Sequence, residues 1–378
     1  MQLSAYIHIP FCSHKCDFCD FVAFAGLTHL EDEYCRIVCE EIKTRLRVLD
    51  AKPSLTSIFY GGGTPGLISP SNISKIHSTL LSHALLVPGA EVTLETTPQA
   101  IDAVKASDWL AIGINRLSVG VETLNDSELS AIGRDHTRNQ AIEGLATAVK
   151  AGFENVSCDL MYGLPTQDLD SWNNTIQDLL NLAHQLEYIR HISAYALDLA
   201  VKSPLLMRFP MSSSSYPAED QFIAMYELLV ASLEHSQFVQ YEISNFSKPG
   251  FQSVHNLNYW NNGQYLGFGV GAHRYTSGYR SSNWRSLSRY LRDYMGNQTN
   301  ELINPSLRAK EAIMLGLRRR EGIDLGRFAE EYGVNILKQF SQSIERLEAG
   351  NFIELVDGKL RLSSKGVPVS NSVIAEFI

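Results

Sequence analysis

The sequence predicts an α/β protein: a partial (βα)6, TIM-like barrel followed by an α+β, winged-helix-like module. Between residues 1 and 200, six short β-rich runs alternate with stretches whose apolar residues recur every three or four positions. Strict alternation favours parallel strands with right-handed crossovers, and six units are fewer than the eight of a closed barrel. After Pro305, three helical segments precede a run with a hairpin turn.

The six β-rich runs also predict what the barrel contains. They are AYIHIP (5–10), SIFYGGG (57–63), EVTLETTP (91–98), NRLSVGVET (115–123), NVSCDLMYGLP (155–165) and HISAYALDL (191–199). Apolar and polar residues alternate along several of them, as Cys158 and Leu160 do with Ser157 and Asp159. The apolar side chains must face the helices, so carboxylates and hydroxyls point inward. A barrel that only packed itself would fill this space with Val, Ile and Leu, so we expect a polar ligand inside.

The remaining chain divides into two further regions. Residues 201–300 begin with a predicted loop to about 215, continue with a helix over 217–236 and end in an aromatic and glycine-rich stretch. Residues 301–378 form the predicted C-terminal module, in which Asp357-Gly358 marks the turn of FIELVDGKLRL. Three consecutive arginines from Arg318 could suggest DNA, but the charge around them does not support such a surface.

Composition excludes several classes of protein. The chain has 378 residues, 44% hydrophobic and 19% charged, which is ordinary for a globular protein. Its formal net charge of -9 argues against a broad surface for nucleic acid or anionic lipid. No run approaches the roughly 18 apolar residues that span a bilayer, and the first residues do not form a signal peptide. We therefore expect a cytoplasmic protein without transmembrane segments or nucleic-acid partners.

Three of the six cysteines are clustered. Cys12-x3-Cys16-x2-Cys19 follows the first predicted strand directly. Thiolates at this spacing can bind three irons of a [4Fe–4S] cluster and leave the fourth iron free for the amine and carboxylate of an amino acid. A structural zinc site is the alternative, but zinc prefers four ligands and no fourth is near. Cys35 and Cys39, one helical turn apart, and Cys158 in the fifth run are expected to pack in or near the core.

The cysteine run belongs to a longer resemblance. YIHIPFCSHKCDFCDF resembles the opening of radical S-adenosylmethionine (SAM) proteins. Within them, the chain is similar to the branch that contains oxygen-independent coproporphyrinogen III oxidase and the HemW-like haem chaperones. The resemblance continues in family order through GGGTP, GVETLND, IGRDH, DLMYGLP, YEISNFSKPG, HNLNYW and GFGVGAH, and so covers nearly the whole chain. It implies a radical SAM barrel, a [4Fe–4S] cluster on the three clustered cysteines, and SAM as a second cofactor.

The resemblance also implies a SAM pocket. Arg134 would pair with the SAM carboxylate, Asp159 with ribose hydroxyls and Glu95 with the methionine end or the ribose. Glu122 stands where relatives usually carry Gln. A carboxylate can accept hydrogen bonds from SAM hydroxyls but cannot donate one, as the amide of Gln can. The remaining pocket candidates, placed near the cluster, the methionine end or the adenine, are Tyr6, Phe18, Gly62, Gly63, Thr64 and Ala196. For each charged residue, a purely structural salt bridge is the alternative.

Two functions compete within this branch. One is an enzyme, the oxidative decarboxylation of porphyrinogen propionates; the other is a haem chaperone, which binds haem and delivers it. The oxidase has a further cysteine two positions past the third, where this chain has Phe21, and a segment ahead of the motif that is not seen here. His255, Tyr259 and Trp260 of HNLNYW match the chaperone motif and could ligate iron and stack on haem; the alternative is a hydrogen-bonded loop histidine.

We therefore expect a haem chaperone without coproporphyrinogen oxidase activity, and we assign no catalytic residue. Whether SAM is cleaved or only bound stays open, as does a homodimer. The expected partner is a haem-accepting protein.

Gly267-x-Gly269-x-Gly271 lacks the spacing of a dinucleotide site, so NAD is not expected.

Overall fold

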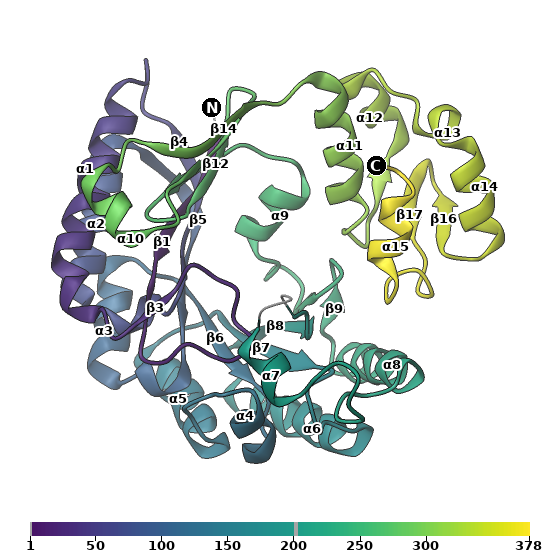
Figure 1. The fold of residues 1–378 in the computed structure, drawn as a ribbon, viewed down its shortest axis with the longest axis horizontal. Coiled ribbons are helices and arrows are strands. Elements are labelled where there is room, and N and C mark those ends of the chain that lie inside the picture. Colours follow the sequence, from purple (N-terminus) through teal and green to yellow (C-terminus); the bar gives the residue numbers. More distant parts are fainter. Residues whose placement is uncertain (1, 200–202) are drawn as a thin grey trace.

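A single curved sheet dominates the computed structural model, which describes residues 2–199 and 203–378. In the described chain this sheet has twelve strands in the order β14-β13-β12-β11-β1-β4-β5-β6-β7-β8-β10-β9. Figure 1 shows the strands as an open arc with helices outside it. Residues 200–202, at the start of the predicted loop and at the predicted end of the core, lie outside the described residues.

The six predicted runs all form strands, and neighbouring members of this set pair in parallel. They are β1 (Gln2–Ile9), β4 (Ser54–Gly62), β5 (Leu85–Thr96), β6 (Arg116–Glu122), β7 (Val156–Tyr162) and β8 (Ile189–Ala196). Cys158 and Leu160 are fully buried on the face that packs against the helices, whereas Asp159 points into the lumen. The predicted partial (βα)6 barrel and its polar interior are confirmed.

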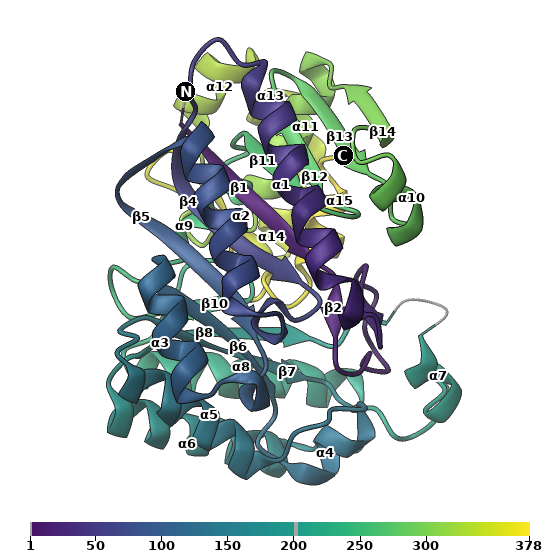
Figure 2. The ribbon, with the colours of Figure 1, turned by 90° about the vertical axis from the view of Figure 1, so that its left-hand side faces the viewer.

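Helices that follow the strands cover the outer face of the arc (Figure 2). They are α1 (Glu31–Arg47), α2 (Pro70–His83), α3 (Ala103–Ile112), α4 (Asp126–Ala131), α5 (Arg138–Ala151) and α6 (Leu169–Leu186). Their ends follow from local sequence. The side chain of Thr137 caps α5 in a capping box with Gln140, and the helix ends at Gly152, whose φ of 114° suits glycine.

Strands between residues 239 and 302 extend the same sheet at both ends. β11 (Tyr265–Phe268) pairs in parallel with β1, so the glycine-rich stretch stands beside the first strand. The other strands of this region pair antiparallel: β9 (Val239–Gln240), β10 (Asn245–Ser247), β12 (His273–Thr276), β13 (Tyr279–Asn283) and β14 (Asn297–Leu302). The helices of residues 203–300 are α7 (Pro204–Arg208), inside the predicted loop, α8 (Glu219–His235), as predicted, α9 (Val254–Trp260) and α10 (Leu287–Arg292).

Helix α9 lies inside the arc of strands, unlike the covering helices (Figure 1). The buried carboxylate of Glu91 on β5 accepts hydrogen bonds from the backbone N–H groups of Val254 and His255 and from the hydroxyl of Ser253. A carboxylate at a helix N-terminus is favourable because it meets unpaired N–H groups and the positive end of the helix dipole. These bonds fix the start of α9 within the lumen.

The C-terminal module consists of helices and a small antiparallel sheet that contains the predicted hairpin, but four helices rather than three precede that hairpin after Pro305. Asp357 and Gly358 both have positive φ, 51° and 74°, as a two-residue hairpin turn requires. The elements are α11 (Pro305–Gly316), β15 (Ile323–Asp324), α12 (Leu325–Tyr332), α13 (Ile336–Gln339), α14 (Ser341–Ala349), β16 (Ile353–Val356), β17 (Lys359–Leu362) and α15 (Ser370–Ala375). None of the described helices is both long and apolar enough to cross a membrane.

A buried carboxylate ties α1 to the added strands. Glu41 is fully buried and accepts hydrogen bonds from Arg45, the backbone N–H of Gly269, Asn283 and the hydroxyl of Tyr290, at 2.7–2.9 Å. Each bond to an ionised oxygen is stronger than a neutral one. Because the donors come from β13, α10 and the turn after β11, Glu41 joins segments more than 200 positions apart in the sequence.

Replacing Glu41 with alanine should lower the free energy of unfolding by roughly 3–5 kcal/mol, since Arg45 and three further donors lose their acceptor. Glu40→Ala is the matched control: Glu40 is 42% exposed and pairs with Lys43 on the surface of the same helix, so its loss should change stability by less than about 0.5 kcal/mol. Denaturant titration of both variants measures the difference. Equal stabilities would show that Glu41 does not hold the added strands.

Candidate functional site

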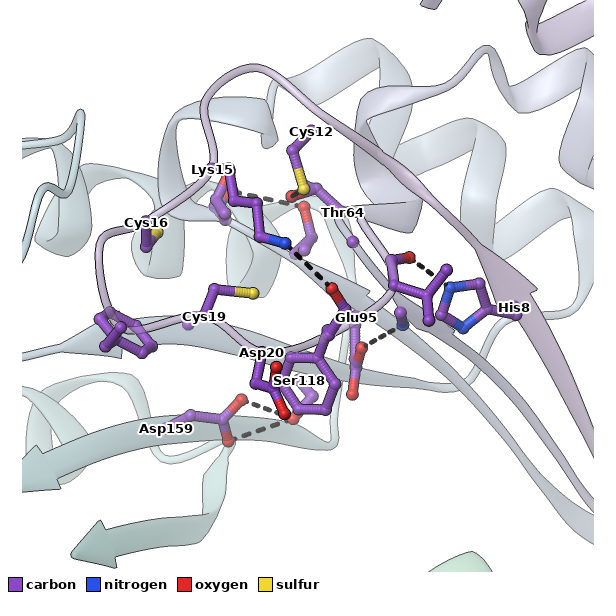
Figure 3. Close-up of a pocket in the computed structure, with 18 of the residues that line it drawn as sticks. His8, Cys12, Lys15, Cys16, Cys19, Asp20, Thr64, Glu95, Ser118 and Asp159 are labelled. Atoms are coloured by element: carbon purple, nitrogen blue, oxygen red, sulfur yellow. Dashed lines mark hydrogen bonds between the residues drawn. The ribbon is translucent and has the colours of Figure 1, made fainter. Parts of the chain in front are cut away.

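A cavity of about 730 Å³ opens where the parallel strands end, and its walls bring together most of the predicted site. The three clustered cysteines line it, as do all of the residues predicted for SAM: Tyr6, Phe18, Gly62, Gly63, Thr64, Glu95, Glu122, Arg134, Asp159 and Ala196. Figure 3 shows part of this wall, with the cysteine loop passing over Glu95, Ser118 and Asp159. In barrels of parallel strands, ligands bind at this end, because loops from every strand meet there.

The cysteine loop is fixed by contacts distant in sequence, and Asp17 is their centre. The backbone N–H of Asp17 donates to the carbonyl of Ile132, and its own carbonyl accepts from Leu205 N–H and the Ser203 hydroxyl. The Asp17 carboxylate pairs with Arg208 at 2.6 Å. The loop is therefore held between the end of α4 and helix α7.

Each cysteine sulfur in the loop has a hydrogen-bond donor beside it. The Thr64 hydroxyl lies 3.8 Å from Cys12 Sγ, Arg134 Nη1 lies 3.3 Å from Cys16 Sγ, and the backbone N–H of Phe21 reaches Cys19. Burial raises the pKa of all three thiols, that of Cys12 to about 11. Bound iron would favour the thiolates, and these donors would stabilise them.

The structure fits an iron–sulfur cluster better than a single zinc ion. Among residues 2–199 and 203–378, no three His, Cys, Asp or Glu side chains converge as the ligands of one metal ion would. A [4Fe–4S] cluster needs no such convergence, since each thiolate binds a different iron at a separate corner. In Figure 3, Cys12 and Cys19 extend from opposite sides of one loop around a common space.

Two glycines at the end of β4, Gly62 and Gly63, bring the backbone against the cluster loop. A Cβ on Gly63 would lie 2.7 Å from the Phe11 carbonyl oxygen and 2.9 Å from Cys12 Sγ. A Cβ on Gly62, at φ 126°, would meet the His8 ring at 2.6 Å. Both positions therefore need glycine, because any side chain would displace the loop or the histidine.

Three carboxylates share the buried cavity. Burial raises the pKa of Glu95 and of Glu122 to about 7 and raises that of Asp159. Asp159 accepts hydrogen bonds from Ser118 at 2.9 and 3.1 Å and from Ser157 at 3.2 Å. Glu122 has a φ of 65°, a strained conformation of the kind found at functional sites. A cationic ligand would offset the acid excess and favour the ionised forms.

Arg134 lies between these carboxylates and the cysteines. Its Nη1 donates to Cys16, its Nη2 donates to the carbonyl of Gly120, and Nη2 is 3.7 Å from Glu122. Its Nε is buried and has no hydrogen-bond partner in the described chain. Buried donors are normally paired, so this unsatisfied nitrogen is consistent with a bound acceptor that the described chain does not supply.

The structure separates the residues of the HNLNYW motif. Tyr259 lines the cavity. His255 is 1% exposed and lies behind it, with Nε2 3.1 Å from the Tyr259 hydroxyl. Trp260 points elsewhere, since the guanidinium of Arg318 covers its ring at 4.8 Å.

The other cysteines pack in the core, as expected. All six cysteines are free thiols, and Cys35, Cys39 and Cys158 are buried, Cys35 and Cys39 more deeply than their amphipathic helix suggests.

Phe21 is 68% exposed at the cavity mouth.

Some residues that line the cavity were not among the site residues predicted from the sequence. Ser118 belongs to the polar face of its strand that is predicted to point inward, in alternation with Gly120 and Glu122, but it was not assigned to the SAM pocket. Tyr265 and His273 could not be predicted, because they come from strands too short to show a periodic pattern.

Comparisons with known proteins agree with this geometry. The model of the Radical SAM superfamily matches residues 6–179, and the model of the HemN C-terminal domain matches residues 303–369. The curated heme chaperone HemW of Bacillus subtilis is 33% identical, covering 99% of both chains, and that of Lactococcus lactis is 30% identical, covering 99% of this chain and 97% of its own. A zebrafish protein named radical S-adenosyl methionine domain-containing protein 1, mitochondrial, is 31% identical over 100% of this chain and 87% of its own.

A solved structure shows the same fold. Coproporphyrinogen III oxidase (HemN) from Escherichia coli superposes with a TM-score of 0.86, at 21% identity, over 100% of this chain and 90% of its own. At 21% identity this likeness supports the same architecture and nothing more. The family is shown by the curated relatives that match this chain along its whole length. The chain belongs to the radical SAM superfamily and, within it, to the HemW family.

Proposed function

We propose that this chain is a haem chaperone that binds haem in the barrel cavity and passes it to a haemoprotein. The observation that carries the proposal is the cavity itself, which combines a complete set of cluster and SAM candidates with a further wall formed by Tyr259 of the HNLNYW motif. The name heme chaperone, borne by relatives that match along their whole length, supports the same function.

Membership of the radical SAM superfamily implies a [4Fe–4S] cluster and SAM. We assign the cluster to Cys12, Cys16 and Cys19, and SAM to the ten predicted residues that line the cavity. The donors beside the three sulfurs and the unpaired Nε of Arg134 support this assignment. When bound, the pair supplies one-electron chemistry; in a chaperone, SAM could serve either as reactant or as a ligand that favours one state of the cavity.

The charge of the cavity supports SAM as its ligand. Glu95, Glu122 and Asp159 exceed the positive charge that Arg134 contributes nearby. SAM carries a sulfonium and an ammonium against one carboxylate, so its net positive charge would meet this acid excess. We place the SAM carboxylate at Arg134 and the cationic groups among the acidic side chains.

The chaperone is favoured over the oxidase by Phe21. The side chain at this position is apolar, exposed and directed to the mouth of the cavity, where the oxidase has a cysteine. An exposed aromatic side chain can pack on the flat, largely apolar face of haem, and it cannot ligate iron as a cysteine can. The likeness to the E. coli oxidase concerns the fold.

The proposed partner is a haem-accepting protein, and the proposed location is a reducing compartment such as the cytoplasm. The six free thiols support that location, since disulfides form and persist in oxidising compartments. Residues of the haem site are proposed from the HNLNYW motif: Tyr259 at the cavity wall, His255 behind it and Trp260 at the end of α9.

The cluster assignment predicts that Cys16→Ala loses most of its iron and sulfide after anaerobic reconstitution, because one of three protein ligands is gone. Cys35→Ala is the matched control: its thiol is buried in α1, so cluster content should be normal. Iron and sulfide analysis distinguishes the two variants. A full cluster in Cys16→Ala contradicts the assignment.

The SAM assignment predicts that Arg134→Ala and Asp159→Asn weaken SAM binding to the reconstituted protein by roughly 1.5–3 kcal/mol each, as for a lost charge-assisted hydrogen bond. Arg138→Ala is the control, because Arg138 pairs with Asp178 on the outer helices and is 39% exposed. Calorimetric titration with SAM measures the three affinities, and iron content confirms that the cluster is intact. Unchanged affinity in both pocket variants would show that SAM binds elsewhere.

The functional proposal predicts that the reconstituted protein binds haem with a Soret band, and that His255→Ala binds it more weakly. It further predicts that no vinyl group forms from coproporphyrinogen III under reducing, anaerobic conditions with SAM. Absorbance titration and product analysis test the two parts. Conversion of the porphyrinogen over several turnovers would show that the chain is an oxidase and not a chaperone. Absence of haem binding in protein with a full cluster would refute the proposed chaperone function.

A further inference from the structure

The imidazole of His255 is enclosed on every side. Its ring stacks on Phe59 with centroids 4.9 Å apart and planes at 27°, and it lies 6.4 Å from the ring of Tyr6. The backbone N–H of His255 is held by Glu91. With 1% of the residue exposed, its ring cannot meet the face of a porphyrin unless α9 leaves the lumen.

Both ring nitrogens of His255 already have partners. Nδ1 lies 2.9 Å from the Ser57 hydroxyl, and Nε2 lies 3.1 Å from the Tyr259 hydroxyl. Ser57 donates its own proton to the Ser4 hydroxyl at 2.8 Å, so its oxygen accepts from Nδ1–H of His255. Nε2 then carries no proton and accepts the hydrogen bond from Tyr259.

The electrostatics of the site agree with a neutral ring. Burial, followed by the charge of Arg116, lowers the pKa of His255 to about 3. The imidazole is therefore uncharged at neutral pH, with one donor and one acceptor nitrogen. Burial raises the pKa of Tyr259, so in the haem-free chain its hydroxyl is a phenol that donates to Nε2.

Tyr259 is the residue of the motif that meets the cavity. It lines the large cavity and also a smaller one, of about 220 Å³, beside α11. Its ring is fixed by edge contacts with His255, at 4.9 Å and 90°, and with Tyr265, at 4.7 Å and 84°. The hydroxyl is therefore held in one position, with one hydrogen bond inward and an oxygen lone pair left for a ligand.

The geometry points to Tyr259, rather than His255, as the motif residue that binds the iron of haem, with His255 as the positioning residue behind it. This inference rests on the proposed haem-binding function and deepens it. A tyrosine can serve as an axial ligand of ferric haem. An acceptor on the far side of its hydroxyl would increase the negative charge on the oxygen and so strengthen the bond to iron.

The bond change involves no redox step. An oxygen lone pair of Tyr259 forms the Fe–O bond, its O–H bond breaks, and the proton passes along the hydrogen bond to Nε2 of His255, where the negative charge of the adjacent iron-bound phenolate stabilises the imidazolium. The Ser57–Ser4 pair holds Nδ1–H and so keeps Nε2 free as the acceptor. A ligand of this kind favours ferric haem, because a hard anionic oxygen prefers Fe(III) to Fe(II).

The experiment is a titration of the full-length, cluster-reconstituted protein with ferric haem, followed by resonance Raman spectroscopy. The wild type should show the vibrations of an iron-bound phenolate. Tyr259→Phe, which removes only the oxygen, should lose them and bind ferric haem about tenfold more weakly or worse. Tyr279→Phe is the control, because Tyr279 is 47% exposed and lines neither cavity, and it should keep them. His255→Gln should keep the phenolate vibrations but bind haem more weakly, because the acceptor is displaced.

A second titration with metal-free protoporphyrin IX separates ligation from packing. Tyr259→Phe should bind this porphyrin as the wild type does, since no iron is present to ligate. Iron content and SAM binding of each variant confirm that the fold is intact.

The outcomes are distinct. Phenolate vibrations that persist in Tyr259→Phe, or a wild-type complex that lacks them and shows histidine ligation, overturn the inference and leave the chaperone proposal standing. No uptake of haem by the wild type refutes both. The wild-type spectrum alone decides between phenolate and histidine ligation, so a variant that fails to fold does not block that part of the test; Tyr259→Phe then distinguishes Tyr259 from the other tyrosines of the cavity wall, Tyr6, Tyr195 and Tyr265.

Discussion

The site depends on the close approach of the Gly62-Gly63-Thr64 backbone to the chain that enters the cysteine loop. Gly63 N–H donates to the carbonyl of Ile9 and Thr64 N–H to that of Phe11, both at 2.8 Å. No side chain fits between them, since a Cβ on Gly63 would touch Cys12 Sγ. These two bonds continue the pairing of β1 with β4 beyond the ends of the strands and hold the first cysteine over the lumen. The other residues proposed to bind the cluster and SAM surround the position at which this contact holds Cys12.

The lumen beneath the loop is acidic, and this sets the chemistry of its ligand. Carboxylates on β5, β6 and β7 stay in a buried space where burial raises their pKa values, so the ligand-free protein carries unfavourable charge or takes up protons. Such an arrangement lowers the stability of the empty protein at neutral pH and is relieved when a cation binds. The barrel is thus built for a cationic ligand and not for self-packing.

Helix α9 changes the meaning of the HNLNYW motif. In many proteins a histidine followed by aromatic residues would place its imidazole on the ligand. Here Glu91 holds the helix inside the arc of strands, which buries His255 and turns Tyr259 to the cavity. In the motif, a hydrogen-bonded chain from Ser4 through Ser57 and His255 therefore ends at the hydroxyl of Tyr259, which lines the cavity. Trp260 joins the same helix to the C-terminal module through Arg318.

The sequence by itself determined the six parallel strands, the polar face of each and the cysteine loop, because strand alternation and motif spacing are local properties of the chain. Together with the family resemblance it also identified ten residues that line the cavity, although Tyr265 and His273 of the same wall were not predicted. It could not place β11 beside β1 or Glu41 beneath β13, because these pairings join residues more than 200 positions apart and have no local pattern. Nor could the sequence show whether Tyr259 or His255 lines the cavity. Which of the two faces the cavity follows from the position of α9 inside the barrel, and only the packing of the whole chain decides that position.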